Sequence, residues 1–421
     1  MKAASQSIIS LLLLHSSTAM TIPPAKPSLN KPGLKIAAGA ALGNILQGFN
    51  TGVIGGALLY IVPEFQLDSR PEVTGLIASS TTMGATLGTL AAGKLLQEGG
   101  RKRTLIVSCA LFLLGGVLMG LAPTTRFLIA GRAIGGIAAG LVSAAVPTYI
   151  AECAEPSQRG ALSTLPQLCV SSGILLSYLV GLAALLFGGS WRLMLGFSLL
   201  PACAQAVFVL SLPESPRWLL SRAKQGDEAK ALAALCKLRG TENVGEELKA
   251  MKAGLAKEQA RANAAGDGKS SGGLGALVKT ADARRALGVC SALQLFQQFC
   301  GVNAIVYFTP QILKQAGAPA LFSSMGVSTD AAAMLATVLA YLPKIPSVLL
   351  ASYLIDRKGR RWMLQKFVPP LAICLAVLAA TTGAGAAPSA LSAFAATSAV
   401  TLFGIFFGMS LGPLPNILAA E

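Results

Sequence analysis

The sequence predicts an all-α membrane protein, and three observations lead to that prediction. Hydrophobic residues make up 53% of the 421 positions and charged residues only 12%, a balance that excludes an ordinary soluble domain. The hydrophobic residues form runs of about 20 or more, the length that a helix needs to cross a bilayer. The basic residues, which give a formal net charge of +16, cluster in short segments between these runs. Membrane topology explains this distribution better than nucleic-acid binding does.

Ten apolar runs form a group of six and a group of four. The polar segment between the groups is expected to form short amphipathic helices beneath the membrane, followed by a flexible run from Gly266 to Gly275. The predicted spans cover residues 35–62, 73–96, 104–122, 127–152, 161–187, 190–212, 286–313, 329–355, 362–384 and 391–420. The predicted domains are a tail at 1–33, a six-helix bundle at 34–212, a cytoplasmic linker at 213–285 and an incomplete four-helix bundle at 286–421.

The loops and the N-terminal tail give the expected orientation. Lys and Arg concentrate after the even-numbered spans, for example at residues 101–103 and 357–361. These loops, and with them the N-terminus, are predicted to be cytoplasmic. The apolar run from Ile8 to Leu14 is too short to cross a membrane. It leaves two interpretations open, a disordered cytosolic tail, which we favour, or a cleaved targeting segment.

Side chains for metal binding or covalent catalysis are scarce. His15, in the N-terminal tail, is the only histidine of the sequence, which disfavours imidazole proton relays, metal clusters and Ser/His/Asp catalysis. The eight cysteines form no CxxC pair, and most lie within or at the edge of apolar spans, where a packed free thiol is expected. The sequence therefore predicts no cofactor, no metal and no enzyme.

A run of amides interrupts the seventh apolar span. Gln294, Gln297 and Gln298 share one helical face with each other, whereas Asn303 falls on the opposite side of an ideal helix. Asn303 joins the glutamines only if the helix breaks. Gly301 is the residue most able to permit a break, because glycine tolerates unusual backbone angles. The run therefore predicts a broken helix beside a polar cavity at the middle of the membrane.

Two short motifs recur in the same order in the two groups of spans. Gly48-Phe49-Asn50 in the first span matches Gly301-Val302-Asn303 in the seventh, and Gly100-Arg101-Lys102 after the second matches Gly359-Arg360-Arg361 after the eighth. Parallel repeats with a binding site at their interface are one standard transporter architecture, in which the halves rock about the site.

Longer motifs carry a family resemblance. They read GFNTGVIGG at 48–56, GRAIGGIAAGLVSAAVPTYIAE at 131–152, PESPRWL at 213–219, QQFCGVNAIVYFTPQIL at 297–313 and DRKGRR at 356–361. With these motifs the chain resembles the sugar porter family of the major facilitator superfamily from about residue 40 onward. Within that family, LSTLPQ at 162–167 and GPLPNILAAE at 412–421 are most similar to the plant vacuolar (tonoplast) monosaccharide transporters.

The resemblance implies a fold and a function. The expected fold is that of the major facilitator superfamily, and the expected function is movement of a hexose such as glucose or fructose by alternating access, with no covalent chemistry. The expected partners are the sugar and the lipid bilayer of a vacuolar or plasma membrane, with the protein as a monomer. Because the family continues through two further spans, the sequence up to Glu421 is expected to be C-terminally truncated. A non-transporting sensor or partial transporter is the competing class.

Amide side chains are the expected sugar ligands, since they both donate and accept hydrogen bonds and so suit polyhydroxylated neutral molecules. The resemblance implies sugar contacts for four amides, which are Gln167, Gln297, Gln298 and Asn303. The aromatic residues are expected to stack on a sugar ring or close the cavity. The alternative for the amides is pairing between helices. The predicted substrate-binding residues are Gln167, Gln297, Gln298, Asn303, Asn50, Phe49, Tyr307 and Asn416.

Charged residues at the cytoplasmic helix ends are expected to form a gate of ion pairs, as in the family, although topology alone would explain the arginines. Gly412-Pro413-Leu414-Pro415 is expected to kink the tenth span and free backbone groups beside the cavity. The predicted gate residues are Arg101, Glu152, Arg159, Glu214, Arg217, Asp356, Arg360, Arg361 and Glu421.

Two positions depart from the family pattern. Proton-coupled sugar porters have an aspartate where this chain has Asn50, facing an arginine that matches Arg132, whereas facilitators have asparagine there. The sequence therefore favours facilitated diffusion over proton coupling. Lys344, between Pro343 and Pro346 near the centre of a span, costs about 3 kcal/mol or more at that depth and marks a functional site. It either binds an anionic substrate, such as a sugar acid or sugar phosphate, or snorkels or pairs with freed carbonyls.

Overall fold

The computed structural model describes residues 31–155, 162, 164–222, 227–264, 281–383 and 389–420, and within them the protein forms helices and no strand. The sequence-based predictions for Ile8 to Leu14, for Gly266 to Gly275, for Arg159 and for Glu421 lie outside these residues. The side chains of Asp356 and Asn416 lie outside the described part as well.

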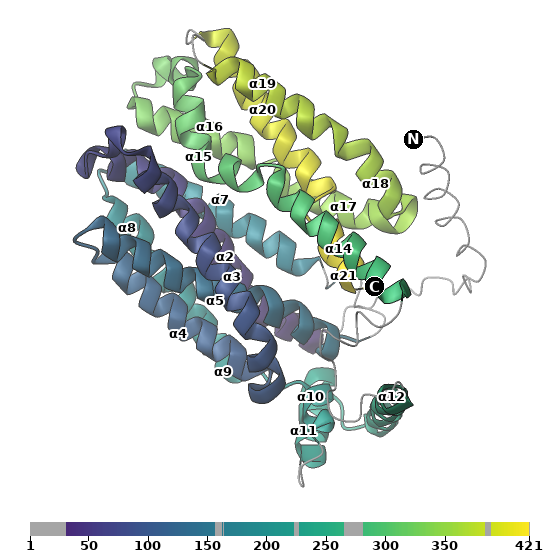
Figure 1. The fold of residues 1–421 in the computed structure, drawn as a ribbon. Coiled ribbons are helices and arrows are strands. Elements are labelled where there is room, and N and C mark those ends of the chain that lie inside the picture. The colour runs from purple at the N-terminus through teal and green to yellow at the C-terminus, as the bar shows by residue number, and fades with distance from the viewer. Residues whose placement is uncertain are drawn as a thin grey trace.

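The first half of the molecule is a bundle of long helices (Figure 1). It consists of α2 (Lys31–Glu64), the 3-10 turn η1 (Leu67–Ser69), α3 (Pro71–Gly99), α4 (Arg101–Gly120), α5 (Thr125–Cys153), α7 (Leu165–Leu186), α8 (Trp191–Gly196) and α9 (Leu199–Ser211).

The second half consists of shorter helices that continue one another in pairs. They are α14 (Ala281–Phe299), α15 (Val302–Gln315), η2 (Ala318–Met325), α16 (Thr329–Tyr341), α17 (Lys344–Lys358), α18 (Arg360–Phe367), α19 (Pro369–Thr382), α20 (Ala390–Met409) and α21 (Leu414–Ala420). The halves meet where α15 packs against α2 and α16 packs against α7 (Figure 1).

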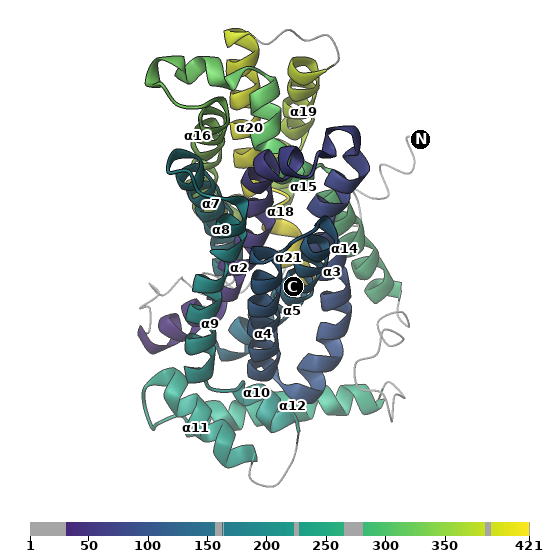
Figure 2. The same cartoon turned by 90° about the vertical axis from the view of Figure 1, so that its left-hand side faces the viewer.

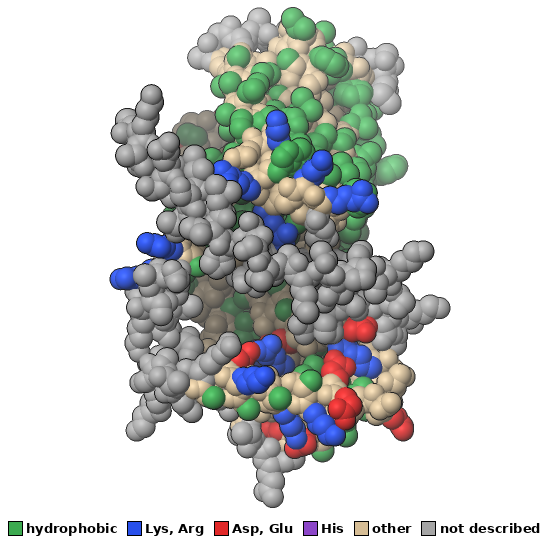
Figure 3. Space-filling model, turned by 90° about the vertical axis from the view of Figure 1, so that its right-hand side faces the viewer, with side chains coloured by type: hydrophobic (Ala, Val, Ile, Leu, Met, Phe, Trp, Pro, Cys, Tyr) green, Lys and Arg blue, Asp and Glu red, His purple; other side chains and the backbone are tan. Residues whose placement is uncertain are grey.

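Three helices lie across one end of the first half (Figure 2): α10 (Pro216–Ser221), α11 (Asp227–Arg239) and α12 (Gly245–Ala264). These helices lie in the polar segment between the two groups of spans, and Trp218, Leu219 and Leu235 form a small buried cluster there. Acidic and basic side chains gather on this end of the surface (Figure 3). We call the end that carries α10 to α12 the basic end.

Nine segments of the described chain are long and apolar enough to cross a membrane, against ten predicted spans. The tenth, predicted at 73–96, is α3, a helix of 29 residues that is not among the nine. It packs closely on α5. An added Cβ on Gly84 would collide with the carbonyl of Ala133, and one on Gly136 with the carbonyl of Thr81. These glycines therefore permit the close contact between α3 and α5.

Besides the span at 286–313, four of the predicted spans consist of two helices each. Pro343 and Pro346 separate α16 from α17, and Pro369 with Pro370 begins α19. In the span predicted at 190–212, the helix breaks after Phe197, between α8 and α9. Each proline lacks the N–H that a continuous helix would donate one turn back. The fourth interruption, between α20 and α21, is the predicted kink.

Candidate functional site

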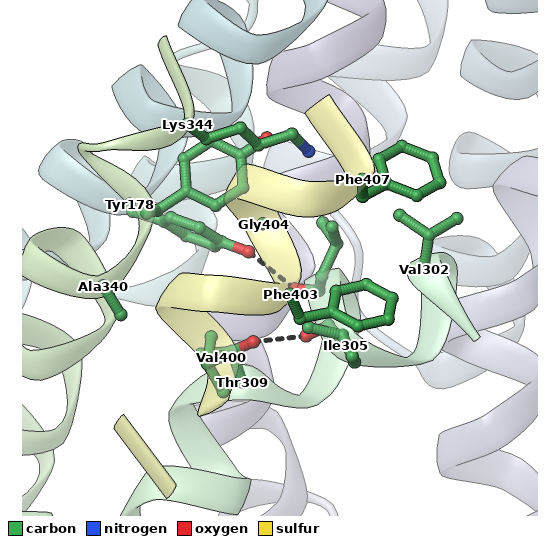
Figure 4. Close-up of a pocket in the computed structure, with 12 residues that line it drawn as sticks. Tyr178, Val302, Ile305, Thr309, Ala340, Lys344, Val400, Phe403, Gly404 and Phe407 are labelled. Atoms are coloured by element: carbon green, nitrogen blue, oxygen red, sulfur yellow. Dashed lines mark hydrogen bonds between the residues drawn. The ribbon is translucent and has the colours of Figure 1, made fainter. Parts of the chain in front are cut away.

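A cavity lies between the two halves (Figure 4). It contains about 330 Å³ of empty space, part of which is open to solvent. Tyr178 of α7 belongs to the first half, and the other lining residues come from α15, α16, α17 and α20. The walls are largely apolar and carry a single charge, that of Lys344. The lining residues are Tyr178, Val302, Ile305, Val306, Thr309, Ala340, Tyr341, Lys344, Val400, Phe403, Gly404 and Phe407.

Lys344 is the first residue of α17 and only 4% exposed. Its ammonium nitrogen lies 4.7 Å from the ring centroid of Tyr341 and 5.3 Å from that of Phe407. Its aliphatic stem passes beside two glycines of α20, since an added Cβ on Gly404 would lie in van der Waals contact with the lysine Cβ at 3.9 Å and one on Gly408 with its Cγ at 3.6 Å. The chain thus places one ammonium against two aromatic faces at the cavity wall.

The predicted helix break at Gly301 is confirmed. Gly301 has φ +83°, a left-handed conformation that favours glycine, and it separates α14 from α15. Asn303 then turns back so that its Nδ2 donates to Oε1 of Gln298 at 2.9 Å. In this conformation the two predicted sugar ligands pair with each other across the break, and Gln298 is exposed.

Gln297 and Gln167 come together at the kink after α20. Nε2 of Gln297 donates to the carbonyl of Leu411 at 2.6 Å and to that of Gly412 at 3.2 Å. These carbonyls are free because the helix stops before Pro413, as the sequence predicts. An added Cβ on Gly412 would lie 3.5 Å from Nε2 of Gln167 and 3.5 Å from the Phe407 ring. Amides from both halves therefore meet beside a wall of the cavity.

Asn50 and Arg132 lie in the first half, away from the cavity walls. Nδ2 of Asn50 donates to the carbonyl of Leu46 on its own helix at 3.1 Å. Arg132 is 1% exposed, and its guanidinium donates to the carbonyl of Ile77 at 2.6 Å, to that of Ala78 at 3.2 Å and to that of Asn50 at 3.5 Å. Backbone carbonyls thus surround Arg132, whereas the matching arginine of proton-coupled porters faces an aspartate.

Phe49, predicted to contact substrate, lies in the core of the first half. Its side chain is fully buried, and its ring stacks on Phe197 with centroids 5.8 Å apart. The residues that line the cavity do not include it. Gly48 is helical, unlike its counterpart Gly301, because α2 runs without interruption against α7. The two copies of the motif therefore differ in conformation.

Tyrosines connect the halves at the side of the cavity away from the basic end. The hydroxyls of Tyr307 and Thr82 lie 2.7 Å apart, and Tyr178 donates to the carbonyl of Val306 at 2.8 Å. The rings of Tyr178 and Tyr341 meet edge to face at 5.3 Å. The sequence reasoning identified Tyr307 but missed the others. The other tyrosines could have been identified because a tyrosine hydroxyl inside an apolar span requires a polar partner.

The basic end holds part of the predicted gate. Arg101 pairs with Glu152 at 2.6 Å, and the other carboxylate oxygen of Glu152 accepts from Ser215 at 2.6 Å. Glu214 accepts from the backbone N–H groups of Arg101 and Lys102 at 3.0 and 3.1 Å. This network joins α4, α5 and α10 within the first half. Of the remaining predicted gate residues in the described chain, Arg217 pairs with Glu258 of α12 at 2.6 Å, and Arg360 and Arg361 begin α18.

The eight cysteines are all free. Among the described residues, no group of three or more His, Cys, Asp or Glu side chains is arranged to hold a metal ion.

Known proteins with similar sequences are transporters. The probable inositol transporter 2 of Arabidopsis thaliana is 35% identical over 333 residues, which are 79% of this chain and 54% of that protein. The chain therefore spans about half the length of that relative. Polyol transporter 5 of the same plant is 32% identical and covers 85% of this chain and 66% of its own length. The arabinose-proton symporter of Escherichia coli (strain K12) is 33% identical and covers 88% of this chain and 72% of its own length.

The fold is similar to that of the xylose transporter XylE from E. coli in a partially occluded inward open conformation. The TM-score is 0.72 with 24% identity, and the match covers 93% of this chain and 85% of that one. A model of the family described as sugar (and other) transporter matches residues 36–421. With this match along nearly the whole sequence, the chain belongs to the sugar (and other) transporter family of the major facilitator superfamily.

Proposed function

We propose that this protein moves a monosaccharide across a membrane by alternating access of a central site. The observation that carries the proposal is the meeting of Gln167 and Gln297, one from each half, at Gly412 beside the cavity. Amides offer donors and acceptors to sugar hydroxyls, and a ligand that contacts both halves responds to their relative movement. Hexoses such as glucose and fructose are the proposed substrates. Asn303, Gln298, Tyr307 and Asn416 are proposed as further ligands.

We further propose facilitated diffusion. None of the residues that line the cavity is acidic. The guanidinium of Arg132 donates its hydrogen bonds to backbone carbonyls and not to a carboxylate that could carry a proton. Proton coupling is the second candidate, since one relative is named as an arabinose-proton symporter. Inositol and polyols are alternative substrates, because other relatives are named as inositol and polyol transporters.

The proposed orientation places the basic end, and with it the N-terminus, in the cytoplasm of a cell, with the protein as a monomer in the vacuolar or plasma membrane. The concentration of Lys and Arg in loops at that end supports it. The network of Arg101, Glu152 and Glu214 is proposed to belong to a cytoplasmic gate that holds one side shut and is released on opening.

Uptake into liposomes tests the proposal. The purified 421-residue chain is reconstituted, and the uptake of labelled glucose, fructose, myo-inositol and sorbitol is measured against empty liposomes. Saturable uptake of a hexose is the expected result. Saturable binding without uptake would replace the transporter proposal with a sensor. Repeating the measurement across a pH gradient separates the two energetic modes, because facilitated diffusion ends at equal concentrations and proton coupling accumulates the sugar.

A further inference from the structure

We propose that the central cavity selects sugar derivatives that carry an anionic group, a carboxylate or a phosphate, with Lys344 as the counter-ion. The inference rests on the proposed function, since the amides at Gly412 are assigned to the hydroxyls of the same ligand. It adds the chemical class of the substrate, which the amides alone leave open.

The first step is the contrast between the two buried cations. The guanidinium of Arg132 is satisfied by the carbonyls of Ile77, Ala78 and Asn50. Lys344 is buried to nearly the same degree, yet in the described part of the chain its ammonium has two aromatic rings and the Cys300 thiol around it and forms no ion pair or hydrogen bond. An ammonium has three donors, and burial of a charge is costly unless it is paired. An acceptor that arrives with the substrate would complete the site.

The second step concerns the other role considered for Lys344, pairing with carbonyls freed by the two prolines. The carbonyl of Leu342 accepts from the backbone N–H of Ile345 at 3.3 Å, and that of Pro343 accepts from Ser347 at 3.3 Å. The prolines free the carbonyls of Leu339 and Leu342. The second of these therefore already has a donor, and within the described residues no hydrogen bond joins the Lys344 ammonium to either. Snorkelling is also not observed, because the side chain is 4% exposed and runs beside Gly404 and Gly408 along the cavity.

The third step is the distance between the charge and the amides. The ring of Phe407 lies 5.3 Å from the Lys344 ammonium on one side. A ring carbon of the same residue lies 3.5 Å from the position of an added Cβ on Gly412, where Gln167 and Gln297 converge. One aromatic side chain therefore separates the cation from the hydroxyl-binding amides. Figure 4 shows Lys344 and Phe407 on the wall of the same cavity. A ligand with hydroxyls and an anionic group at its end would contact both.

Equilibrium binding to the purified 421-residue chain provides the test, with labelled D-glucose and D-glucuronate as probes. These two sugars differ only in a carboxylate that replaces the terminal CH2OH group. We expect the wild type to bind glucuronate at least about tenfold more tightly than glucose, the size expected of a hydrogen bond to a charged group. Lys344→Gln is expected to bring this preference to about one, whereas Lys344→Arg, which keeps the charge, is expected to retain a preference.

Lys366→Gln is the matched control, because Lys366 is an exposed residue of α18 and the variant loses the same charge far from the cavity lining. It is expected to keep the wild-type preference. An excess of acetate is included to distinguish a sugar-linked anion from a free one, and it is expected not to displace glucuronate.

Two results would overturn the inference while leaving the proposed function intact: equal affinities for the two sugars in the wild type, or an unchanged preference in Lys344→Gln. Displacement of glucuronate by acetate would overturn it in favour of a general anion site. Binding of neither sugar by the wild type would reject the proposed function and the inference together. If Lys344→Gln fails to fold, the wild-type preference and Lys344→Arg still decide the outcome.

Discussion

The hydroxyl of Tyr307 in α15 lies 2.7 Å from the hydroxyl of Thr82 in α3, and this hydrogen bond joins the two halves of the protein. Tyr178 adds a second connection by donating to the carbonyl of Val306. Gly55 supports both, since an added Cβ there would lie 3.1 Å from the carbonyl of Tyr307. These contacts hold the halves together at the end opposite the basic end. They stabilise the conformation described here, in which the two halves are in contact at these residues.

Tyr307→Phe is predicted to shift the protein toward the conformation that is open at this end. The lost hydrogen bond contributes about 1 kcal/mol, which changes a two-state population about fivefold. Spin labels at Phe187 and Leu321, exposed residues at this end of the two halves, report the opening as a longer distance in a cysteine-free background.

Thr82→Val is the control for that experiment, because it removes the same bond and leaves the proposed sugar ligand in place. Both single variants are expected to open the protein to the same degree, and the double variant no further. Additive effects of the two substitutions would show that the bond is not their common cause.

Gln297→Glu is predicted to lose most transport activity. The substitution removes the two donated hydrogen bonds and places a carboxylate oxygen against the carbonyls of Leu411 and Gly412. Leaving such buried acceptors unpaired costs about 1–3 kcal/mol for each group. The melting temperature in detergent and the initial rate of hexose uptake are both expected to fall.

Gln298→Glu is the comparison for Gln297→Glu. Gln298 is exposed and accepts from Asn303 through Oε1, which the variant can still do. Its melting temperature is expected to stay near that of the wild type. Equal loss of stability in both variants would contradict the role given to the contacts of Gln297 with the kink.

Features of this structure that depend on the backbone properties of single residues could be predicted from the sequence, whereas features that depend on contacts between helices could not. The break at Gly301 and the stop before Pro413 follow from the backbone properties of single residues, and both are confirmed. The direction of a side chain relative to another helix is not local. Phe49 shares its motif with Val302, which lines the cavity, yet Phe49 stacks on Phe197. The repeat predicts corresponding positions, whereas packing against different neighbours decides their environments.

Gly48→Ala is predicted to destabilise the first half. An added Cβ would collide with the backbone carbonyl of Val170 in α7, and a helix backbone cannot move aside as the end of a flexible side chain can. The expected cost is about 1–3 kcal/mol, measured as a lower melting temperature. Gly93→Ala is the control, since no atom lies within 4 Å of its added Cβ. Similar melting temperatures for the two variants would contradict the close approach of α2 and α7.

Asn50→Asp is predicted to make transport depend on a proton gradient. The new carboxylate would lie in the same buried region as the Arg132 guanidinium, which already reaches the Asn50 carbonyl at 3.5 Å, and it would supply the titratable group that the first span lacks. In liposomes with an imposed pH gradient, the variant is expected to accumulate hexose above equilibrium, whereas the wild type stops at equal concentrations.

Asn44→Asp introduces an acid into the same helix at another buried position and serves as the control, because Asn44 pairs with Gln47 and not with Arg132. Accumulation by the wild type, or by both variants equally, would show that the energetics do not depend on residue 50.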